Sequence, residues 1–501
     1  MIDQTYDFII LGAGTSGCFL AEKLSRDEHA KVLLVEAGNL SRNPVLSMPA
    51  GFTQTLFDKK YNWCFNSAPE AQLNGRGIYC PRGKVVGGSS MINGMIHSIG
   101  QQEDYDGWLK EGFSLSDSQG VMSKFGELFP EGDGITRAQP HPLESIFLSA
   151  CKESGLPYSD RLHESQSINS AGPYYHTTKN GRRNGVTSIL PVLRERKNVV
   201  LLTHTHIDKL QIENDRVVQV NAIYRGKKAC NIKVTGELIL SLGAIGSPAV
   251  LQRSGIGSHD TLKKAGVETV IDLPTGKLSG MRTYNSDASG ASLAKTLWDY
   301  SVNRKGPLIG GASSLGAFIS VGEQDLPDTQ MFFSYGSGKN TTKALVVDSF
   351  DAVTIGSYQL RPESRGSVSI SSSDPMKSPV IHYNYLSTEN DWSMSRKGLE
   401  FQESLMARSA FAPFNPEAVV NNLSHDDYIR QFADTAHHPV GTCAVGKNGV
   451  VDGDLTVKGL KNLRIADASI IPRIISGNTQ AISAVIGNLL GDKMLSRSQH
   501  V

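Results

Sequence analysis

The chain has 501 residues, of which 39% are hydrophobic and 20% are charged, so it is long enough to bury a large core and to form two domains. Fifty Lys and Arg residues against 49 Asp and Glu residues leave a net charge of +1, and the sequence contains no basic run of the kind that binds a polymer of phosphates. We therefore expect no nucleic-acid partner.

Cysteine usage and hydropathy predict the compartment. The six cysteines are scattered, with no CxxC pair and no histidine cluster at zinc spacing, so we expect a reduced cytoplasmic protein without a metal site. The first apolar segment begins within a few residues of the N-terminus and leaves no room for a signal peptide. No apolar stretch reaches the roughly 18 residues of a membrane span, so we expect no integral membrane segment. A peripheral membrane contact and the oligomeric state stay open.

Residues 6–17 predict a buried strand that breaks into a glycine turn and then a helix. Gly12 would permit the tight turn, Gly14 would let a pyrophosphate approach the backbone, and Gly17 would let the helix lie close to the strand. The free amides at the helix N-terminus would bind the phosphates. This pattern is typical of a dinucleotide pocket.

The flanking segments support this interpretation. A helix predicted over residues 15–26 has an apolar face, and a second apolar strand over residues 31–35 ends at Glu36. A carboxylate about 20 residues beyond the last glycine accepts hydrogen bonds from an adenosine ribose. Its charge would repel a phosphorylated ribose, which argues against NADP. NAD and FAD both fit at this point.

A second glycine- and serine-rich stretch covers residues 81–95. Its composition, followed by a helical apolar pattern, indicates backbone amides and hydroxyls that face a polar ligand at another helix N-terminus. Composition alone also allows a flexible surface turn.

Together, GAGTSG with Glu36 and RGKVVGGSSMINGM resemble the two flavin-binding signatures of the glucose-methanol-choline (GMC) oxidoreductases. The resemblance implies FAD, with the second segment running along the pyrophosphate and under the isoalloxazine ring. Some relatives attach the flavin covalently through a histidine two residues after the serine pair. This chain has Ile92 there, which implies non-covalent FAD. The cofactor contacts that the resemblance implies are Gly12, Gly14, Thr15, Ser16, Gly17, Glu36, Ala37, Arg82, Val86, Gly87, Ser90, Asn93, Gly94, Met95, Ile207, Asp467, Ala468, Asn478 and Thr479.

The segment between the flavin signatures and residue 195 is more polar and resembles a short version of the family's insert. Residues 172–183 also match the family and are expected to form one wall of the substrate space. For Arg182 and Arg183 a solvated turn is an equal alternative.

Short strands are predicted next, over residues 199–203, 207–212, 216–224 and 238–241. Their alternating apolar residues favour an antiparallel appendage that leads back to a buried strand. The resemblance places the backbone of Ile207 at the adenine.

Residues 242–257 predict a strand, a glycine turn and a short helix, and they closely match the family's second sequence signature. The loop at 275–282 departs from the family pattern, which weakens inference of the substrate from relatives. Residues 354–360 and 367–370 alternate like strands joined by a turn and resemble a sheet behind the substrate cavity. We interpret Arg361 and Arg365 as structural ion-pair residues.

Residues 386–406 predict a return rich in helix, and the closing segment carries the candidate catalytic residues. Oxidation of an alcohol by a flavin requires a base near the ring, and histidine, with an unperturbed pKa near 6.5, suits that role. His438 occupies the family's catalytic position in HPVGTC, whereas His437 is interpreted as a packing residue. Asn478 occupies the second catalytic position, where its amide can orient the substrate oxygen.

Other features of this segment are less specific. Asp467 and Ala468 resemble the residues where the tail returns to the flavin, before a last helix predicted over residues 480–494; a capping loop without cofactor contact is the alternative. Cys443 is expected to be buried packing. Arg473 stands where relatives often have a small polar residue, and an inward orientation would favour an acidic substrate.

We therefore predict an α/β protein with a Rossmann-like FAD-binding domain, comprising a parallel sheet, helices and an antiparallel appendage, plus a substrate domain with an antiparallel sheet and helices. The FAD domain would comprise residues 1–100, 196–284 and 432–501, and the substrate domain residues 101–195 and 285–431. The resemblance implies oxidation of a small alcohol to a carbonyl, with oxygen or a quinone-like compound as electron acceptor, and is nearest to the choline and L-sorbose dehydrogenase branch. The alcohol and the acceptor stay open. A lyase with structural FAD and a cofactor-free binding protein are the alternatives.

Overall fold

The computed structural model describes residues 5–164, 166–273, 311–336, 338–340, 345–347, 352–420 and 422–498. A five-stranded parallel sheet with the order β10-β2-β1-β14-β22 forms the centre of its first region. These strands are β1 (Phe8–Leu11), β2 (Val32–Val35), β10 (Val199–Leu202), β14 (Glu237–Leu240) and β22 (Leu463–Ile465). The apolar runs of β1, β2 and β14 are almost completely buried, as expected for parallel strands covered on both faces.

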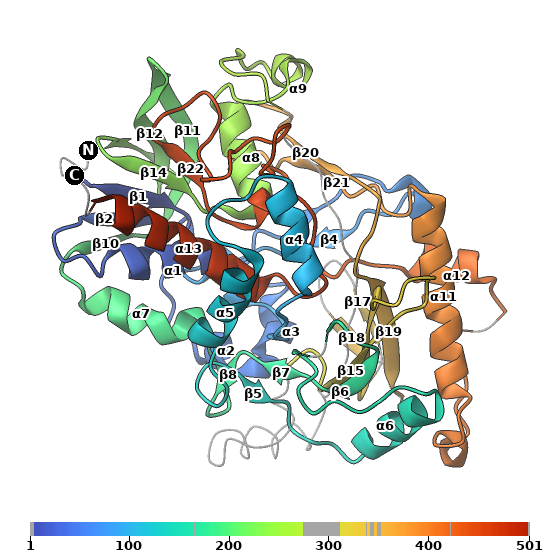
Figure 1. Ribbon diagram of the computed structural model, residues 1–501. Coiled ribbons are helices and arrows are strands. Elements are labelled where there is room, and N and C mark those ends of the chain that lie inside the picture. Colours follow the sequence, from blue (N-terminus) through green and yellow to red (C-terminus); the bar gives the residue numbers. More distant parts are fainter. Residues whose placement is uncertain are drawn as a thin grey trace.

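Helices from the two ends of the chain pack together beside this sheet (Figure 1). They are α1 (Thr15–Leu24) and α13 (Gln480–Ser498), and the Ser16 hydroxyl donates a hydrogen bond to the Ser483 carbonyl at 2.6 Å. A Cβ on Gly487 would lie 2.3 Å from the Ser16 carbonyl oxygen, so glycine permits the close approach. The segment that follows β1 is therefore held by the last helix.

The antiparallel appendage is present with one correction. It comprises β11 (Thr205–Glu213), β12 (Arg216–Tyr224) and β13 (Lys228–Lys233). The strand expected over residues 199–203 does not belong to it. Instead β10 pairs in parallel with β2, because its run of consecutive apolar residues suits an edge of the buried sheet better than an alternating surface hairpin.

A four-stranded antiparallel sheet forms the centre of the second region, in the order β19-β16-β15-β6. Its strands are β6 (Ser170–Pro173), β15 (Leu315–Ile319), β16 (Thr329–Ser334) and β19 (Thr354–Gln359), and the predicted helix appears as α11 (Glu389–Met406) packed on β19.

The segments at 354–360 and 367–370, which were predicted as strands joined by a turn, belong to different sheets. Strand β20 (Ser367–Ser369) pairs with β21 (Val380–His382) instead of continuing from β19. The connection is diverted because Asp391 accepts hydrogen bonds from the backbone amides of Glu363 and Ser364, both at 2.8 Å.

The other elements cover and connect these sheets. The helices are α2 (Pro44–Ser47), α3 (Phe52–Thr55), α4 (Gln102–Lys110), α5 (Ser118–Leu128), α6 (Glu144–Glu153), α7 (Val186–Glu195), α8 (Gly243–Arg253), α9 (His259–Lys264) and α12 (His425–Phe432). The short strands are β3 (Phe65–Asn66), β4 (Tyr79–Cys80), β5 (Thr136–Arg137), β7 (Tyr175–His176), β8 (Thr178–Lys179), β9 (Arg182–Arg183), β17 (Gly338–Asn340) and β18 (Leu345–Val347).

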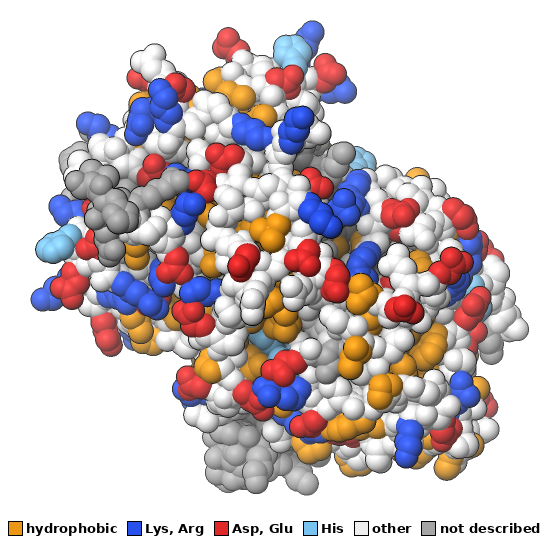
Figure 2. All heavy atoms as spheres, in the orientation of Figure 1, with side chains coloured by type: hydrophobic (Ala, Val, Ile, Leu, Met, Phe, Trp, Pro, Cys, Tyr) orange, Lys and Arg blue, Asp and Glu red, His pale blue; other side chains and the backbone are white. Residues whose placement is uncertain are grey.

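The α/β architecture with parallel and antiparallel sheets confirms the predicted fold class. Helix α7 packs against α1 and α5 against α13, so parts of the 101–195 segment lie beside the parallel sheet. The predicted domain division stays a prediction, and its 284/285 boundary and the unusual 275–282 loop lie outside the described residues. None of the helices in the described ranges is both long and apolar enough to cross a membrane. Figure 2 shows acidic and basic side chains intermixed over one face, in keeping with the near-zero net charge.

Candidate active site

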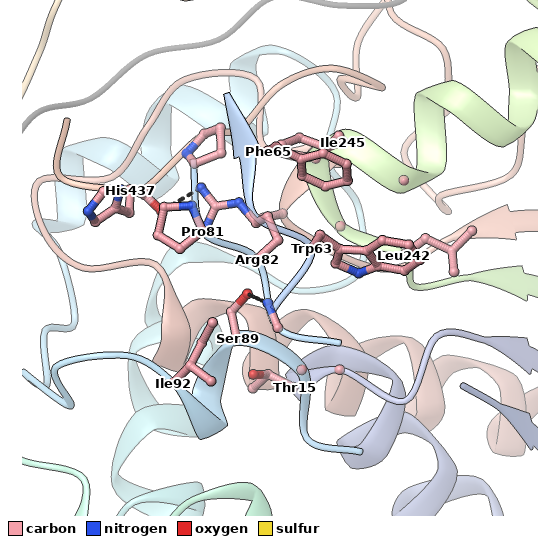
Figure 3. Close-up of a pocket in the computed structure, with 18 of the residues that line it drawn as sticks. Thr15, Trp63, Phe65, Pro81, Arg82, Ser89, Ile92, Leu242, Ile245 and His437 are labelled. Carbon is pink, nitrogen blue, oxygen red and sulfur yellow. Dashed lines mark hydrogen bonds between the residues drawn. The ribbon is translucent and has the colours of Figure 1, made fainter. Parts of the chain in front are cut away.

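A cavity of about 450 Å³ begins where the carboxyl ends of β1, β2 and β14 meet, which is the usual binding place in an open parallel sheet. It extends to the second sheet, where Phe332 of β16 and Tyr358 of β19 form part of its wall. Figure 3 shows the middle of this cavity, with Arg82, Ser89, Ile92 and Trp63 from the N-terminal segments around it.

The three glycines of the first turn have the separate roles that the sequence indicates. Gly12 has a φ of +105°, and a Cβ there would lie 2.3 Å from the Ser241 carbonyl oxygen. A Cβ on Gly17 would lie 2.0 Å from the carbonyl oxygen of Gly12, so α1 can approach β1 only with glycine at this position. A Cβ on Gly14 would lie 3.8 Å from its nearest neighbour, the Ser241 carbonyl oxygen, so there is room for a side chain at this glycine, which lines the cavity.

Glu36 lies directly after β2 with both carboxylate oxygens engaged. Oε2 accepts a hydrogen bond from the Ala13 amide at 3.1 Å, and Oε1 accepts one from the Gly38 amide at 2.8 Å. Burial raises the pKa of Glu36 to about 7, although these amides oppose the shift. The carboxylate thus fixes the glycine turn and still lines the cavity.

The second glycine-rich stretch is a short 3₁₀ helix over Gly88–Met91 that packs on the first turn. The Gly87 amide donates a hydrogen bond to the Ala13 carbonyl at 2.7 Å. A Cβ on Gly88, whose φ is +56°, would lie 2.8 Å from the Cα of Gly14. This contact excludes the alternative of a flexible surface turn, because the two glycine-rich segments form one wall.

His438 and Asn478 meet at the far end of the cavity, with Nδ2 of the asparagine 3.4 Å from Nε2 of the histidine. Burial, with a smaller contribution from the Arg82 charge, lowers the pKa of His438 to about 3. The imidazole is therefore neutral at pH 7 and can accept a proton. The Asn478 Oδ1 atom is buried and has no hydrogen-bond partner among the residues that the structure describes.

Arg82 holds the backbone beside this pair. Its Nη2 donates a hydrogen bond to the His437 carbonyl at 2.8 Å, and the two residues lie together in Figure 3. His437 has a φ of 63°, in the left-handed region that few non-glycine residues adopt, and its amide donates to the Thr435 hydroxyl at 3.1 Å. His437 thus positions its neighbour His438 through the backbone.

Most of the predicted site residues line this one cavity, although they come from distant segments. Those along its wall are Gly12, Gly14, Thr15, Ser16, Glu36, Ala37, Arg82, Ser90, Asn93, Gly94, Met95, Ile207, His438, Asp467, Ala468, Asn478 and Thr479. Gly17, Val86 and Gly87 are absent from that wall. Gly17 packs against Gly12, the Val86 amide donates to the Asn39 carbonyl, and Gly87 donates to Ala13, so these three support the wall from behind.

Asp467 both lines the cavity and caps backbone. Its Oδ2 accepts hydrogen bonds from the Gly243 amide at 2.9 Å and the Ser247 hydroxyl at 2.6 Å, and its Oδ1 accepts one from the Ser469 amide at 2.8 Å. These bonds connect the start of α8 to the segment after β22.

The structure corrects two interpretations of arginines. The Arg473 side chain is 71% exposed and lies 3.6 Å from a Glu111 carboxylate oxygen, so it does not point inward toward a substrate. Arg361 donates to the Pro327 carbonyl and the Gln101 side chain, and Arg365 donates to nearby carbonyls. Both are structural, but through hydrogen bonds to neutral oxygens instead of the expected ion pairs. Cys443 is fully buried, as expected.

Sequence reasoning missed several residues around the site. Phe332 and Tyr358 line the cavity from strands whose pairing partners are distant in sequence, and no local motif marked them. Arg183 is buried and contacts the second flavin segment, whereas Arg182 beside it is exposed. The period-two alternation of a hairpin strand could have separated these two arginines.

Comparison with known proteins adds the family. Two family models described as GMC oxidoreductase match residues 6–277 and 362–487. The chain belongs to the GMC oxidoreductase family. It is 33% identical to an alcohol dehydrogenase [acceptor] of Pseudomonas putida, over 96% of this chain and 94% of that protein. It is also 33% identical to an oxygen-dependent choline dehydrogenase of Pseudomonas savastanoi pv. phaseolicola, over 98% and 94% of the two chains.

The fold matches solved members as well. The crystal structure of pyridoxine 4-oxidase from Mesorbium loti superposes with a TM-score of 0.83 at 26% identity, covering 98% of this chain and 99% of that one. This GMC oxidoreductase is accordingly an FAD-dependent enzyme, and its residues fit the cofactor. Gly14 leaves room for a pyrophosphate and, as the N-cap of α1, forms no side-chain hydrogen bond to the first amides, and Glu36 offers an acceptor for ribose hydroxyls.

Proposed function

We propose that this enzyme oxidises the CH–OH group of an alcohol to a carbonyl. The observation that carries the proposal is the pairing of a neutral His438 with Asn478 at the end of the cavity opposite Glu36. His438 Nε2 would accept the hydroxyl proton, and the Asn478 amide would orient the substrate oxygen. Bound FAD supplies the hydride acceptor.

The chemistry of the cavity wall favours an uncharged alcohol with an apolar or aromatic body. Ile96, Ala312, Phe332 and Tyr358 line it on the side of the second sheet. Among the described residues of the lining, Glu36 and Asp467 are the carboxylates; Glu36 accepts backbone amides at the adenosine end, and Asp467 accepts amide and hydroxyl hydrogen bonds. A quaternary ammonium substrate would therefore lack a partner of opposite charge among these residues.

We also propose that FAD is held without a covalent bond, because the side chain after Ser89, Ser90 and Met91 in the second flavin segment is the hydrocarbon of Ile92, which lines the cavity. Precipitation of the protein with acid should leave the yellow colour in the supernatant. Colour that stays in the pellet would contradict this proposal.

The function is tested by mixing the holoenzyme without oxygen with benzyl alcohol, 1-hexanol, glucose and choline at matched concentrations. We expect benzyl alcohol or hexanol to bleach the flavin absorbance fastest, and choline to bleach it slowest. Admission of air or of a quinone then shows which acceptor restores the colour. A yellow protein that none of a wide panel of alcohols bleaches, but that cleaves a cyanohydrin, would be a lyase and would overturn the proposal.

A further inference from the structure

A buried arginine lies behind the cofactor wall and plays no part in the mechanism above. Arg183 ends the short β8–β9 hairpin and is 3% exposed, whereas its neighbour Arg182 is exposed to solvent. Its Nη1 donates hydrogen bonds to the Ser90 carbonyl at 2.9 Å and to Oδ1 of Asn93. Ser90 and Asn93 both line the cavity, so this guanidinium bonds directly to two residues of the cavity wall.

The charge of Arg183 has no counter-ion in the part of the chain that the structure describes. Within the described ranges, its acceptors are a carbonyl and an amide oxygen, and its Nε and Nη2 atoms are buried without hydrogen-bond partners. Burial lowers the pKa of Arg183 to about 9, which still leaves it protonated at pH 7. A buried charge without a partner destabilises a fold, so an anion that arrives during function would gain from it.

Arg183 is also connected to the segment that carries Asn478, through hydrogen bonds of the neutral side chains of Asn93 and Gln480. Asn93 Nδ2 donates to the Oε1 atom of Gln480, and that oxygen accepts a second bond from the Thr177 hydroxyl at 3.4 Å. Gln480 lies two residues after Asn478 and begins α13. The guanidinium thus fixes the orientation of Asn93 and, through it, the approach of the last segment to the cavity.

We propose that Arg183 is a positioning residue whose uncompensated charge, held behind Ser90 and Asn93, makes the bound flavin a better acceptor of negative charge. The inference rests on FAD binding by the family and not on the identity of the alcohol. Reduction by hydride brings two electrons to the ring, and a cation fixed nearby in a site of low dielectric stabilises the negative charge that results.

Sulfite titration of the oxidised holoenzyme tests this without substrate, because sulfite adds to oxidised flavin and leaves negative charge on the ring. Arg183→Gln, loaded to full FAD occupancy, should bind sulfite about tenfold more weakly than the unmodified enzyme, and its flavin reduction potential should fall. A tenfold change corresponds to about 1.4 kcal/mol, which is the order of the Coulomb energy of one unit charge in a partly buried site.

Two variants separate charge from shape. Arg183→Lys keeps the charge but cannot form the same pair of hydrogen bonds, and it should bind sulfite within about threefold of the unmodified enzyme. Arg182→Gln removes an equal charge from the exposed side of the same strand and should change nothing. The proposal is overturned if Arg183→Gln titrates like Arg182→Gln, or if Arg183→Lys loses as much affinity as Arg183→Gln.

A measurement on the unmodified enzyme covers the case in which Arg183→Gln does not fold. The spectrum of the reduced holoenzyme is followed with falling pH beside free reduced FAD. The bound flavin should remain anionic at least one pH unit lower than free flavin. Protonation of both at the same pH would overturn the inference.

Discussion

The two ends of the cavity differ in how completely the protein satisfies its own polar groups. At the adenosine end, both oxygens of Glu36 accept backbone amides, and the two glycine-rich segments are bonded to each other. At the end that we propose to be catalytic, the Asn478 Oδ1 atom is buried without a hydrogen-bond partner among the described residues, and the same holds for two nitrogens of Arg183 behind the wall. Since buried polar groups are normally paired, we expect the unpaired oxygen of Asn478 to be satisfied when a ligand binds. The predictions below test this contrast, from the largest effect to the smallest.

Gly14→Glu should abolish FAD binding while the protein remains folded. The nearest contact of a new Cβ is 3.8 Å, so the backbone tolerates it, but the carboxylate would enter the space of the pyrophosphate and repel it. The ratio of flavin to protein after purification and the circular dichroism of the variant give the result. Gly14→Ala is the matched control and should keep FAD. Stoichiometric FAD in the Gly14→Glu protein would show that the anchor lies elsewhere.

His438→Ala should lower the rate of anaerobic flavin reduction by about 10²–10⁴-fold, the usual contribution of a general base. FAD content should not change, because the anchor lies at the other end. His437→Asn serves as control, since asparagine tolerates the left-handed conformation at this position. A larger loss in the control would assign the base to His437.

In the pH profile of kcat/KM, the acid limb should have an apparent pKa below 6.5, because burial and the Arg82 charge lower the pKa of His438. Stopped-flow reduction between pH 4 and pH 8 measures it. An apparent pKa near or above 6.5 would contradict the proposal that the base is an imidazole whose pKa is lowered by burial.

Stability of the apoprotein should fall as pH rises from about 4.5 to about 7. Glu36 has its pKa raised to about 7 from 4.5 by burial, so the folded state binds more protons than the unfolded state over this window. The loss would amount to about 3 kcal/mol if this group acted alone. Urea unfolding of apoprotein at several pH values measures it, and Glu36→Gln should flatten the profile. FAD affinity should change in the opposite direction, rising through pH 7 as the carboxylate forms to accept ribose hydroxyls.

Asn478→Ala should reduce kcat/KM by an amount that corresponds to about 1–3 kcal/mol, the value of one hydrogen bond in a buried site. Asn478→His, which retains a donor, should recover most of this loss. Equal losses in both variants would mean that the amide packs against His438 but does not orient the substrate.

The sequence was most informative about site residues whose roles depend on the conformation of the backbone around them. The turn at Gly12 and the acidic residue at the end of β2 follow from short-range patterns, and the motif around His438 follows from the family resemblance. The structure brings all three into one cavity. It was least informative about groups placed by tertiary pairing. Phe332 and Tyr358 reach the cavity only because β16 pairs with β19, and Arg183 is buried only because its hairpin packs on the second flavin segment.

Two further differences concern the sheet to which β10 belongs and the orientation of Arg473. The strand predicted over residues 199–203 was grouped with the appendage because the segments there alternate, but the apolar run of β10 fits the parallel sheet. An inward Arg473 was the condition for an acidic substrate, and this condition is not met because Arg473 is exposed and lies beside Glu111 at the surface.

The packing of α13 on α1 also sets an order of events in biosynthesis. The turn at Gly12 is synthesised before the rest of the cavity wall, but the Ser16 hydroxyl that follows it is held by Ser483, and His438 and Asn478 come from segments far later in the chain. The cavity wall is therefore closed only after nearly all of these residues have been synthesised. A chain that stops before α13 would therefore leave the turn at Gly12 without the support that Ser483 and Gly487 give to Ser16.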